Sequence, residues 1–220
     1  YSKRLINLFL ELKKVLKSEK LDIEFAFDKK NELYLFQVRK IIVKRKSAKV
    51  CLIDSLKNIQ RKISNINLSH PDIYGNKTIL GVMPDWNPAE IIGVYPRPLA
   101  ISIYKELVTD SIWSYQRDNY GYKRLRSFPL LIDLEGLPYI DTRLSFNSFI
   151  PKTMSEDISK KLVNLYLRQL KNQPYLHDKI EFDIVYSCFT FNLKKKLNLL
   201  KGKLFSKNQI NIIFKSLLKL

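Results

Sequence analysis

The chain has 220 residues, 45% of them hydrophobic and 27% charged, which is typical of globular proteins and excludes a disordered one. No run of about 20 apolar residues occurs, so we expect no membrane-spanning helix. The net charge is +18, but Lys dominates the basic residues and they are spread along the whole chain. We therefore interpret the charge as solvated surface and keep a nucleic-acid-binding module as the non-enzyme alternative.

The cysteine content points to a reducing compartment. Only Cys51 and Cys188 occur, and neither belongs to a CxxC pair. We favour two buried free thiols over a disulfide or a zinc site. The expected location is therefore the cytoplasm, with no membrane partner.

Hydrophobic periodicity predicts an α+β chain whose first part combines helices with one hairpin. The predicted elements are a helix over 2–18, strands over 21–27 and 33–39, a basic run over 40–49 and a helix over about 51–66. A turn-rich passage over 69–76 follows, and we interpret it as a domain boundary.

The second part alternates short strands with helices. Its predicted elements are a strand near 78–83, a proline-rich loop over 83–90, a long helix from Pro98 to about Tyr120, a hairpin of strands over 128–134 and 138–145, a helix over 155–171, a strand over 180–189 and two short helices at the end of the chain. Pro98 fits the first turn of its helix because the N–H it lacks would have no partner there.

The first hairpin has one apolar and one polar face if Asp22 pairs with Arg39 and the loop is Lys29–Glu32. The apolar pairs are then Ile23 with Val38, Phe25 with Phe36, and Phe27 with Tyr34. On the other face Asp22 lies opposite Arg39, Glu24 opposite Gln37, and Ala26 opposite Leu35. A shift of one residue would mix the two faces, so we expect this register.

The polar face carries groups that suit a magnesium–phosphate ligand. Asp22 and Glu24 offer two carboxylates, and Mg²⁺ takes oxygen ligands from one or two carboxylates and from substrate phosphates. Arg39 can orient a transferring phosphoryl group. An ordinary surface strand pair with cross-strand charge partners explains the same residues, and spacing alone leaves both interpretations open.

The two strands resemble the closing hairpin of the ATP-grasp domain in the phosphoenolpyruvate synthase and pyruvate phosphate dikinase family. The match covers Asp22–Ala26 and Leu35–Arg39, with Phe25 where Trp is usual and Lys40 in place of Pro. This resemblance implies ATP and Mg²⁺ as cofactors. It further implies that Asp22, Glu24 and Gln37 serve the metal–nucleotide complex, with Asp22 and Glu24 on the metal, and that Arg39 contacts phosphate.

Segments of the second part resemble the middle region of a branch of that family found in bacterial capsule gene clusters, which includes an L-glutamine kinase. The matching segments are Met83–Glu90, Pro96–Ala100, Tyr120–Tyr122 and Tyr139–Phe149. The resemblance implies that 1–45 ends an ATP-grasp domain, 46–77 is a helical linker and 78–220 is an acceptor-binding domain. We then expect a piece of a larger phosphotransferase for capsular polysaccharide modification, which phosphorylates the amide of L-glutamine and releases AMP and phosphate.

Enzymes of this family carry the phosphoryl group on a histidine in a glycine-rich segment. His70 and His177 both lack neighbouring glycines, and we interpret them as structural or surface residues. We therefore assign no catalytic residue to this chain and expect the phosphocarrier histidine in a separate domain beyond residue 220. A pyruvate-type or other small-molecule acceptor is the alternative, although the barrel that binds pyruvate has no counterpart here.

An amino-acid acceptor needs a cation for its carboxylate and an anion for its ammonium group. The candidate residues are Asp85, Asn87 and Glu90 in the proline-rich loop, Arg97 between two prolines, and Asp141 with Arg143 on one predicted strand. Structural roles compete with these assignments. Asp85 or Asn87 can cap a helix near Pro88 with Trp86 in the core, and Asp141 can form a structural ion pair with Arg143.

Overall fold

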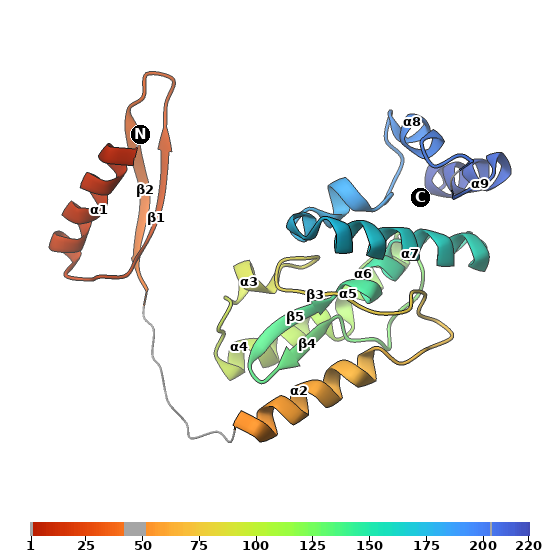
Figure 1. Cartoon of the computed structure of the whole chain (residues 1–220), viewed down its shortest axis with the longest axis horizontal. Coiled ribbons are helices and arrows are strands. Elements are labelled where there is room, and N and C mark those ends of the chain that lie inside the picture. Colours follow the sequence, from red (N-terminus) through yellow and green to blue (C-terminus); the bar gives the residue numbers. More distant parts are fainter. Residues whose placement is uncertain (1, 42–51, 203) are drawn as a thin grey trace. The chain divides into compact units, whose positions relative to one another are not determined.

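The computed structural model describes residues 2–41, 52–202 and 204–220 (Figure 1). Internal contacts divide the chain into Tyr1–Val50, here the hairpin unit, and Cys51–Leu220, here the helical unit. Each unit combines helices with a small antiparallel sheet, which confirms the predicted α+β class. Cys51 and most of the basic run 40–49 lie outside the described residues. Within the described parts of the chain, no helix is both long and apolar enough to cross a bilayer.

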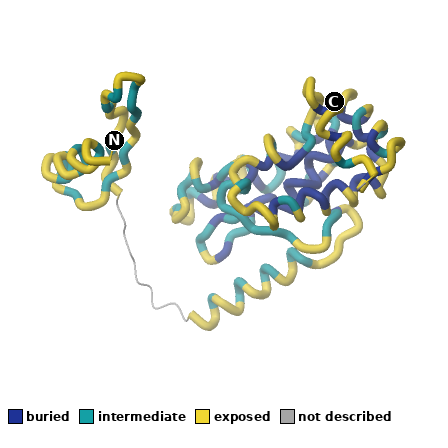
Figure 2. The backbone as a smooth tube through the Cα atoms, turned by 45° about the horizontal axis from the view of Figure 1, so that its top comes forward, coloured by how far each residue is buried: buried dark blue, intermediate teal, exposed yellow. Residues whose placement is uncertain are grey.

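The hairpin unit consists of α1 (Ser2–Leu16), β1 (Leu21–Phe27) and β2 (Leu33–Lys40), as the sequence predicts. The apolar stripe of α1 and the hairpin enclose a groove of about 480 Å³. None of the described residues of this unit is buried (Figure 2). The described residues of the hairpin unit therefore form secondary structure without a closed core.

The register of the hairpin is confirmed in its first half and wrong in its second. Asp22 pairs with Arg39 and Glu24 with Gln37, but a bulge then makes Phe36 the extra residue of β2. Phe25 therefore pairs with Leu35, Ala26 with Tyr34, and Phe27 with Leu33.

The bulge goes with a longer loop than predicted. The loop covers residues 28–32, and the Asp28 carboxylate accepts hydrogen bonds from the N–H groups of Lys30 (2.9 Å) and Glu32 (2.8 Å). Such an Asp-centred turn sets the loop length locally, and the bulge absorbs the extra residue.

The helical unit contains the remaining elements. They are α2 (Leu52–Ile66), β3 (Leu80–Gly81), α3 (Pro88–Ile91), α4 (Pro98–Tyr104), the π-helix η1 (Lys105–Thr109), α5 (Ile112–Asn119), β4 (Leu131–Leu134), β5 (Leu137–Asp141), α6 (Thr142–Ser148), α7 (Glu156–Asn172), the 3₁₀ turn η2 (Pro174–Leu176), the π-helix η3 (Ile180–Ile184), α8 (Leu193–Asn198) and α9 (Lys207–Leu218). The strands form one antiparallel sheet in the order β3-β5-β4.

Several predicted elements need correction. The long helix from Pro98 is interrupted by η1, and the strand predicted over 138–145 ends at Asp141 because the Asp141 side chain caps α6. The strand predicted over 180–189 is replaced by η3, whose turn brings Ile180 and Ile184 to one buried face. Cys188 is exposed rather than buried.

The buried helix α6 organises the core of the helical unit. Phe146 packs among residues of α7, while Leu144 belongs to a second apolar cluster that includes Trp113 and Ile140. All seven residues of α6 are buried, although five of them are polar or charged. Burying such groups is favourable only when they are hydrogen-bonded, so α6 must draw partners from neighbouring loops.

The passage 69–76 supplies two of these partners. Asn147 accepts a hydrogen bond from the Tyr74 N–H and donates one to the Tyr74 carbonyl, each at 2.9 Å. Ile73 is buried in the second apolar cluster. The turn-rich passage interpreted as a domain boundary therefore packs within the helical unit, and the division between units falls earlier in the chain.

Candidate functional site

The hairpin unit brings the four predicted nucleotide-site residues together. Asp22 and Glu24 alternate with apolar residues on β1, and the observed register places Arg39 and Gln37 directly opposite them. The Arg39 Nη2 atom lies 2.9 Å from Asp22 Oδ2 and 3.6 Å from Glu24 Oε1. All four residues are exposed to solvent. Two carboxylates, an amide and a guanidinium thus share one accessible face.

These groups fit a magnesium–phosphate ligand in part. Among the described residues, no group of three or more His, Cys, Asp or Glu side chains is placed to hold a metal. Asp22 and Glu24 would therefore supply two oxygen ligands, and phosphate oxygens and water would complete the coordination, as is usual for Mg²⁺. Arg39 at present bridges the two carboxylates, which shows that this face accommodates a cation between them.

In the helical unit, Asp85 is the centre of a buried polar cluster. Its carboxylate accepts hydrogen bonds from Arg117 Nη2 at 2.8 Å and from Ser145 Oγ at 2.7 Å. The Arg117 guanidinium also lies 4.0 Å from the centre of the Phe149 ring. Both carboxylate oxygens of Asp85 are thus occupied, and the residue ties the proline-rich loop to α5 and α6.

The loop that carries Asp85 has a strained backbone. Asp85 and the following Trp86 both adopt left-handed conformations, with φ angles of 40° and 52°. Two consecutive non-glycine residues in this region are rare, and such strain persists only where surrounding contacts enforce it. The Tyr104 hydroxyl donates a hydrogen bond to the Trp86 carbonyl and supplies one such contact. Trp86 is 36% exposed, so the alternative that placed it in the core is wrong.

Burial controls the acidity of this cluster. It raises the pKa of Asp85, whereas the charge of Arg117 and the hydrogen bond from Ser145 oppose the rise. The pKa of Glu181 is also raised, first by burial and then by the nearby negative charge of Asp85. The positive charge of Arg117 opposes the rise of the pKa for both carboxyl groups.

The other predicted acceptor residues are dispersed. Asn87 caps α3 by accepting a hydrogen bond from the Glu90 N–H at 3.2 Å, and the Glu90 side chain is exposed. Arg97 is exposed at the N-cap of α4, between its two prolines. The Asp141 carboxylate accepts hydrogen bonds from the Leu144 N–H and from the Thr78 hydroxyl.

Arg143 lies in α6 rather than on the strand of Asp141. Its guanidinium is buried and donates to the carbonyls of Gly75, at 3.3 Å, and Ile66. Asp141 and Arg143 therefore each hold a separate part of the chain, and the predicted ion pair between them is replaced by these hydrogen bonds.

The two histidines contact nearby backbone. The Nδ1 atom of His70 accepts a hydrogen bond from the Asp72 N–H at 3.1 Å, and that of His177 lies 3.0 Å from the Pro174 carbonyl. His177 also lines a cavity of about 470 Å³ beside α7.

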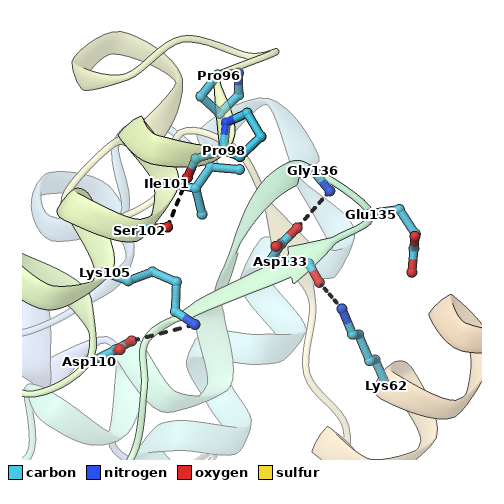
Figure 3. Close-up of a pocket in the computed structure, with 10 residues that line it drawn as sticks. All are labelled: Lys62, Pro96, Pro98, Ile101, Ser102, Lys105, Asp110, Asp133, Glu135 and Gly136. Atoms are coloured by element: carbon cyan, nitrogen blue, oxygen red, sulfur yellow. Dashed lines mark hydrogen bonds and ion pairs between the residues drawn. The ribbon is translucent and has the colours of Figure 1, made fainter. Parts of the chain in front are cut away.

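A cavity of about 670 Å³ with several charged lining residues lies beside α4 and the β4–β5 turn (Figure 3), and the sequence did not predict it. Its charged lining residues are Lys62, Lys105, Asp110, Asp133 and Glu135. Lys62 lies in α2, Lys105 and Asp110 lie in η1 and at its C-cap, and Asp133 and Glu135 lie in β4 and the turn after it, so no short sequence motif joins them. The sequence feature nearest to this cavity was the pair Pro96 and Pro98, which line it and flank the candidate acceptor residue Arg97.

Comparison of the chain with protein-family models, with curated proteins and with solved structures finds no match. The resemblance to the dikinase family therefore rests on the sequence segments alone.

Proposed function

We propose that the chain contributes to an ATP-dependent phosphotransferase of the phosphoenolpyruvate synthase and pyruvate phosphate dikinase type. The hairpin unit would form part of the nucleotide site, and the helical unit would bind the acceptor. One phosphoryl group of ATP would pass through a histidine of another domain to the side-chain amide of L-glutamine, and water would accept the other, so that AMP and inorganic phosphate are released. The observation that carries the proposal is the shared, solvent-accessible face of Asp22, Glu24, Gln37 and Arg39.

Each residue of this face has a chemical task in the proposal. Magnesium-bound ATP supplies the phosphoryl group and the metal charge that neutralises its oxygens. Asp22 and Glu24 hold the metal, and the Gln37 amide hydrogen-bonds to the nucleotide. Arg39 exchanges its carboxylate partners for phosphate oxygens, which it binds through two parallel N–H groups. This exchange costs little because the existing ion pairs are exposed.

The helical unit offers a rigid frame for the acceptor. Asp85 is engaged by Arg117 and Ser145, so we assign it to positioning the loop. Glu90 and Arg97 are exposed, and each offers one charge to a ligand. The choice of an amino-acid acceptor over pyruvate rests on the resemblance to the L-glutamine kinase branch.

The test is glutamine-dependent formation of AMP by the complete protein that contains this chain. We expect AMP to form with ATP, Mg²⁺ and L-glutamine and not with pyruvate in place of glutamine. The double variant Asp22→Asn/Glu24→Gln and the single variant Arg39→Met should each lower the rate by roughly 10- to 100-fold, the loss expected for a charge-assisted contact.

Matched controls come from the same hairpin. Glu32→Gln removes an exposed carboxylate at the loop end, and Lys40→Met removes the cation next to Arg39, so both should leave the rate within about twofold. Equal activity of the site variants and the controls would contradict the nucleotide-site assignment. AMP formation with pyruvate but not with glutamine would replace the acceptor and keep the phosphotransferase.

A further inference from the structure

The acidic residues of the chain end well before its lysines do. All 21 Asp and Glu residues precede Ile184, whereas residues 184–220 contain eight lysines and no arginine. The lysines that the structure describes in this segment are all exposed, and none of them forms an ion pair with another described residue. The end of the helical unit therefore carries a concentrated positive charge.

Three of these lysines form the outer surface of α8. Leu193 and Leu197 lie on the inner side of this helix, in the core of the helical unit. Because one helical turn takes 3.6 residues, Lys194, Lys195 and Lys196 occupy the remaining sides, and all three are exposed. Figure 1 shows α8 beside α9 at one end of the unit, beyond α7.

Apolar side chains flank these lysines at both ends of α8. Leu199, at the C-cap of the helix, is 70% exposed and lies one turn after Lys195. Phe191, just before the N-cap, is fully exposed. The centre of its ring lies 6.2 Å from that of Phe189, which in turn lies 6.1 Å from the ring of Phe214 in α9. These ring contacts hold the loop before α8 against α9.

Lysines mixed with exposed Phe and Leu side chains fit an anionic lipid surface. Ammonium groups are attracted to negative headgroups, and Phe and Leu side chains gain by entering the boundary between headgroups and acyl chains. A nucleic acid also offers phosphates, but proteins bind it preferentially through Arg and through stacking of bases on aromatic rings. Residues 184–220 lack Arg, and a leucine has no ring on which a base could stack.

We propose that one end of the helical unit, here the basic surface, binds a bilayer that contains anionic phospholipid. The basic surface consists of Phe189, Phe191, Lys194, Lys195, Lys196 and Leu199. Its lysines contact headgroup phosphates, and its apolar side chains enter the boundary below them. Such peripheral binding needs no spanning helix, and it departs from the expectation of no membrane partner. It does not depend on the proposed phosphotransferase activity.

The test is co-sedimentation of the 220-residue chain with vesicles of phosphatidylcholine alone or of equal parts phosphatidylcholine and phosphatidylglycerol. We expect binding to the anionic vesicles only, and a loss of binding as the salt concentration rises. The variant Lys194→Gln/Lys195→Gln should lower the partition coefficient by about 25-fold, since each lysine near an anionic surface contributes roughly a factor of five.

A matched control removes two positive charges from another helix of the same unit. Lys57 and Arg61 are exposed on α2, which lies away from α8 in both views (Figure 1, Figure 2). Charges separated by more than a Debye length, about 10 Å, are largely screened. Lys57→Gln/Arg61→Gln should therefore leave the partition coefficient within about twofold of the wild type.

A second pair of variants tests insertion of apolar side chains. Leu199 and Leu99 of α4 are both 70% exposed, so replacing either by Ser should leave the fold intact, which circular dichroism checks. Leu199→Ser should lower the partition coefficient about tenfold because it removes an inserted side chain, whereas Leu99→Ser should change it by less than about twofold. If Leu199→Ser fails to fold, Phe191→Ser provides the same test.

Three results would overturn the proposal: no binding to either kind of vesicle, equal binding to both kinds, or unchanged binding in a folded Leu199→Ser variant. A labelled single-stranded RNA is titrated in parallel by fluorescence anisotropy. RNA binding at lower protein concentration than vesicle binding, lost in Lys194→Gln/Lys195→Gln and kept in Leu199→Ser, would assign the basic surface to nucleic acid instead. None of these measurements uses ATP, so their outcome is independent of the AMP assay.

Discussion

Each unit contains an ion pair between an aspartate and an arginine, and the two pairs differ in their exposure to solvent. In the hairpin unit, Arg39 lies 2.9 Å from Asp22, and the side chains are 58% and 48% exposed. In the helical unit, Arg117 lies 2.8 Å from Asp85, and the side chains are only 15% and 3% exposed. The geometry is nearly the same, but the surroundings differ. The exposed pair can therefore exchange its partners, whereas the buried pair must stay intact.

Burial accounts for this difference because it removes the competing solvent. Water screens the exposed pair and replaces either partner at little cost, so a metal ion or phosphate can displace Arg39. A buried carboxylate without its partner has no such replacement. We therefore expect the hairpin unit to tolerate loss of an arginine and the helical unit to respond strongly.

The largest effect is expected for Arg117→Met, which leaves Asp85 buried without its cation. We expect the free energy of unfolding to fall by about 3–5 kcal/mol. Both tryptophans of the chain, Trp86 and Trp113, lie in the helical unit, so fluorescence during urea unfolding reports on this unit alone.

The matched variant in the hairpin unit is Arg39→Met. We expect a loss of about 0–1 kcal/mol, measured by hydrogen exchange of the β1–β2 amides. Losses of similar size for Arg117→Met and Arg39→Met would contradict the claim that burial sets the contribution of each ion pair.

A smaller loss of stability is expected for Gly75→Ala, because the structure leaves no space for a side chain at this position. Gly75 has a φ of 96°, and an added Cβ atom would lie 2.6 Å from Leu167 Cδ1. Gly93 has nearly the same φ, 92°, but nothing lies within 4 Å of the added atom. Both alanine variants carry the left-handed strain, roughly 1 kcal/mol, and only Gly75→Ala adds overpacking of about 1–3 kcal/mol.

Thermal unfolding of the two glycine variants measures this difference directly. A larger loss for Gly75→Ala assigns the effect to packing against α7. Equal losses would show that α7 moves aside at little cost, and that the core is less tightly packed there than the distances indicate.

The sequence predicted best where a local pattern decides the structure. The alternation of apolar and polar residues placed Asp22 opposite Arg39, and helical periodicity located α1 and α7. It failed where tertiary contacts decide. The alternation over 180–189 suits a strand with Ile180, Phe182 and Ile184 on one face, but a π-turn buries both isoleucines and leaves Phe182 exposed. The contacts of Asp85 with Arg117 and Ser145 join segments that are distant in the sequence, so hydrophobic periodicity does not predict them.

A fall in pH should lower the stability of the helical unit, because Asp118 becomes protonated. Hydrogen bonds from Lys152 and Arg126 lower the pKa of this carboxyl group in the folded state. As the pH falls, the unfolded chain therefore takes up the proton first, and the contribution of Asp118 is lost on passing below about pH 4.

Urea midpoints of the wild type and of Asp118→Asn should therefore differ near pH 7, and the difference should shrink as the pH falls below about 4. The exposed Asp178→Asn serves as the control for removal of one negative charge. A constant difference between wild type and Asp118→Asn over this range would assign the effect of Asp118 to packing instead of charge.

The smallest effect concerns the strained turn at the edge of the cavity in Figure 3. Glu135 and Gly136 both have positive φ angles, 55° and 89°, which is the geometry of a type I′ hairpin turn. Asn favours the first of these positions, whereas Glu pays a steric cost there, so Glu135→Asn should raise the free energy of unfolding by roughly 0.5 kcal/mol. Glu135→Gln removes the charge and keeps the strain, so it should give no gain. If both variants stabilise the unit equally, the cost of Glu135 lies in its charge near Asp133, and the backbone of the turn is relaxed.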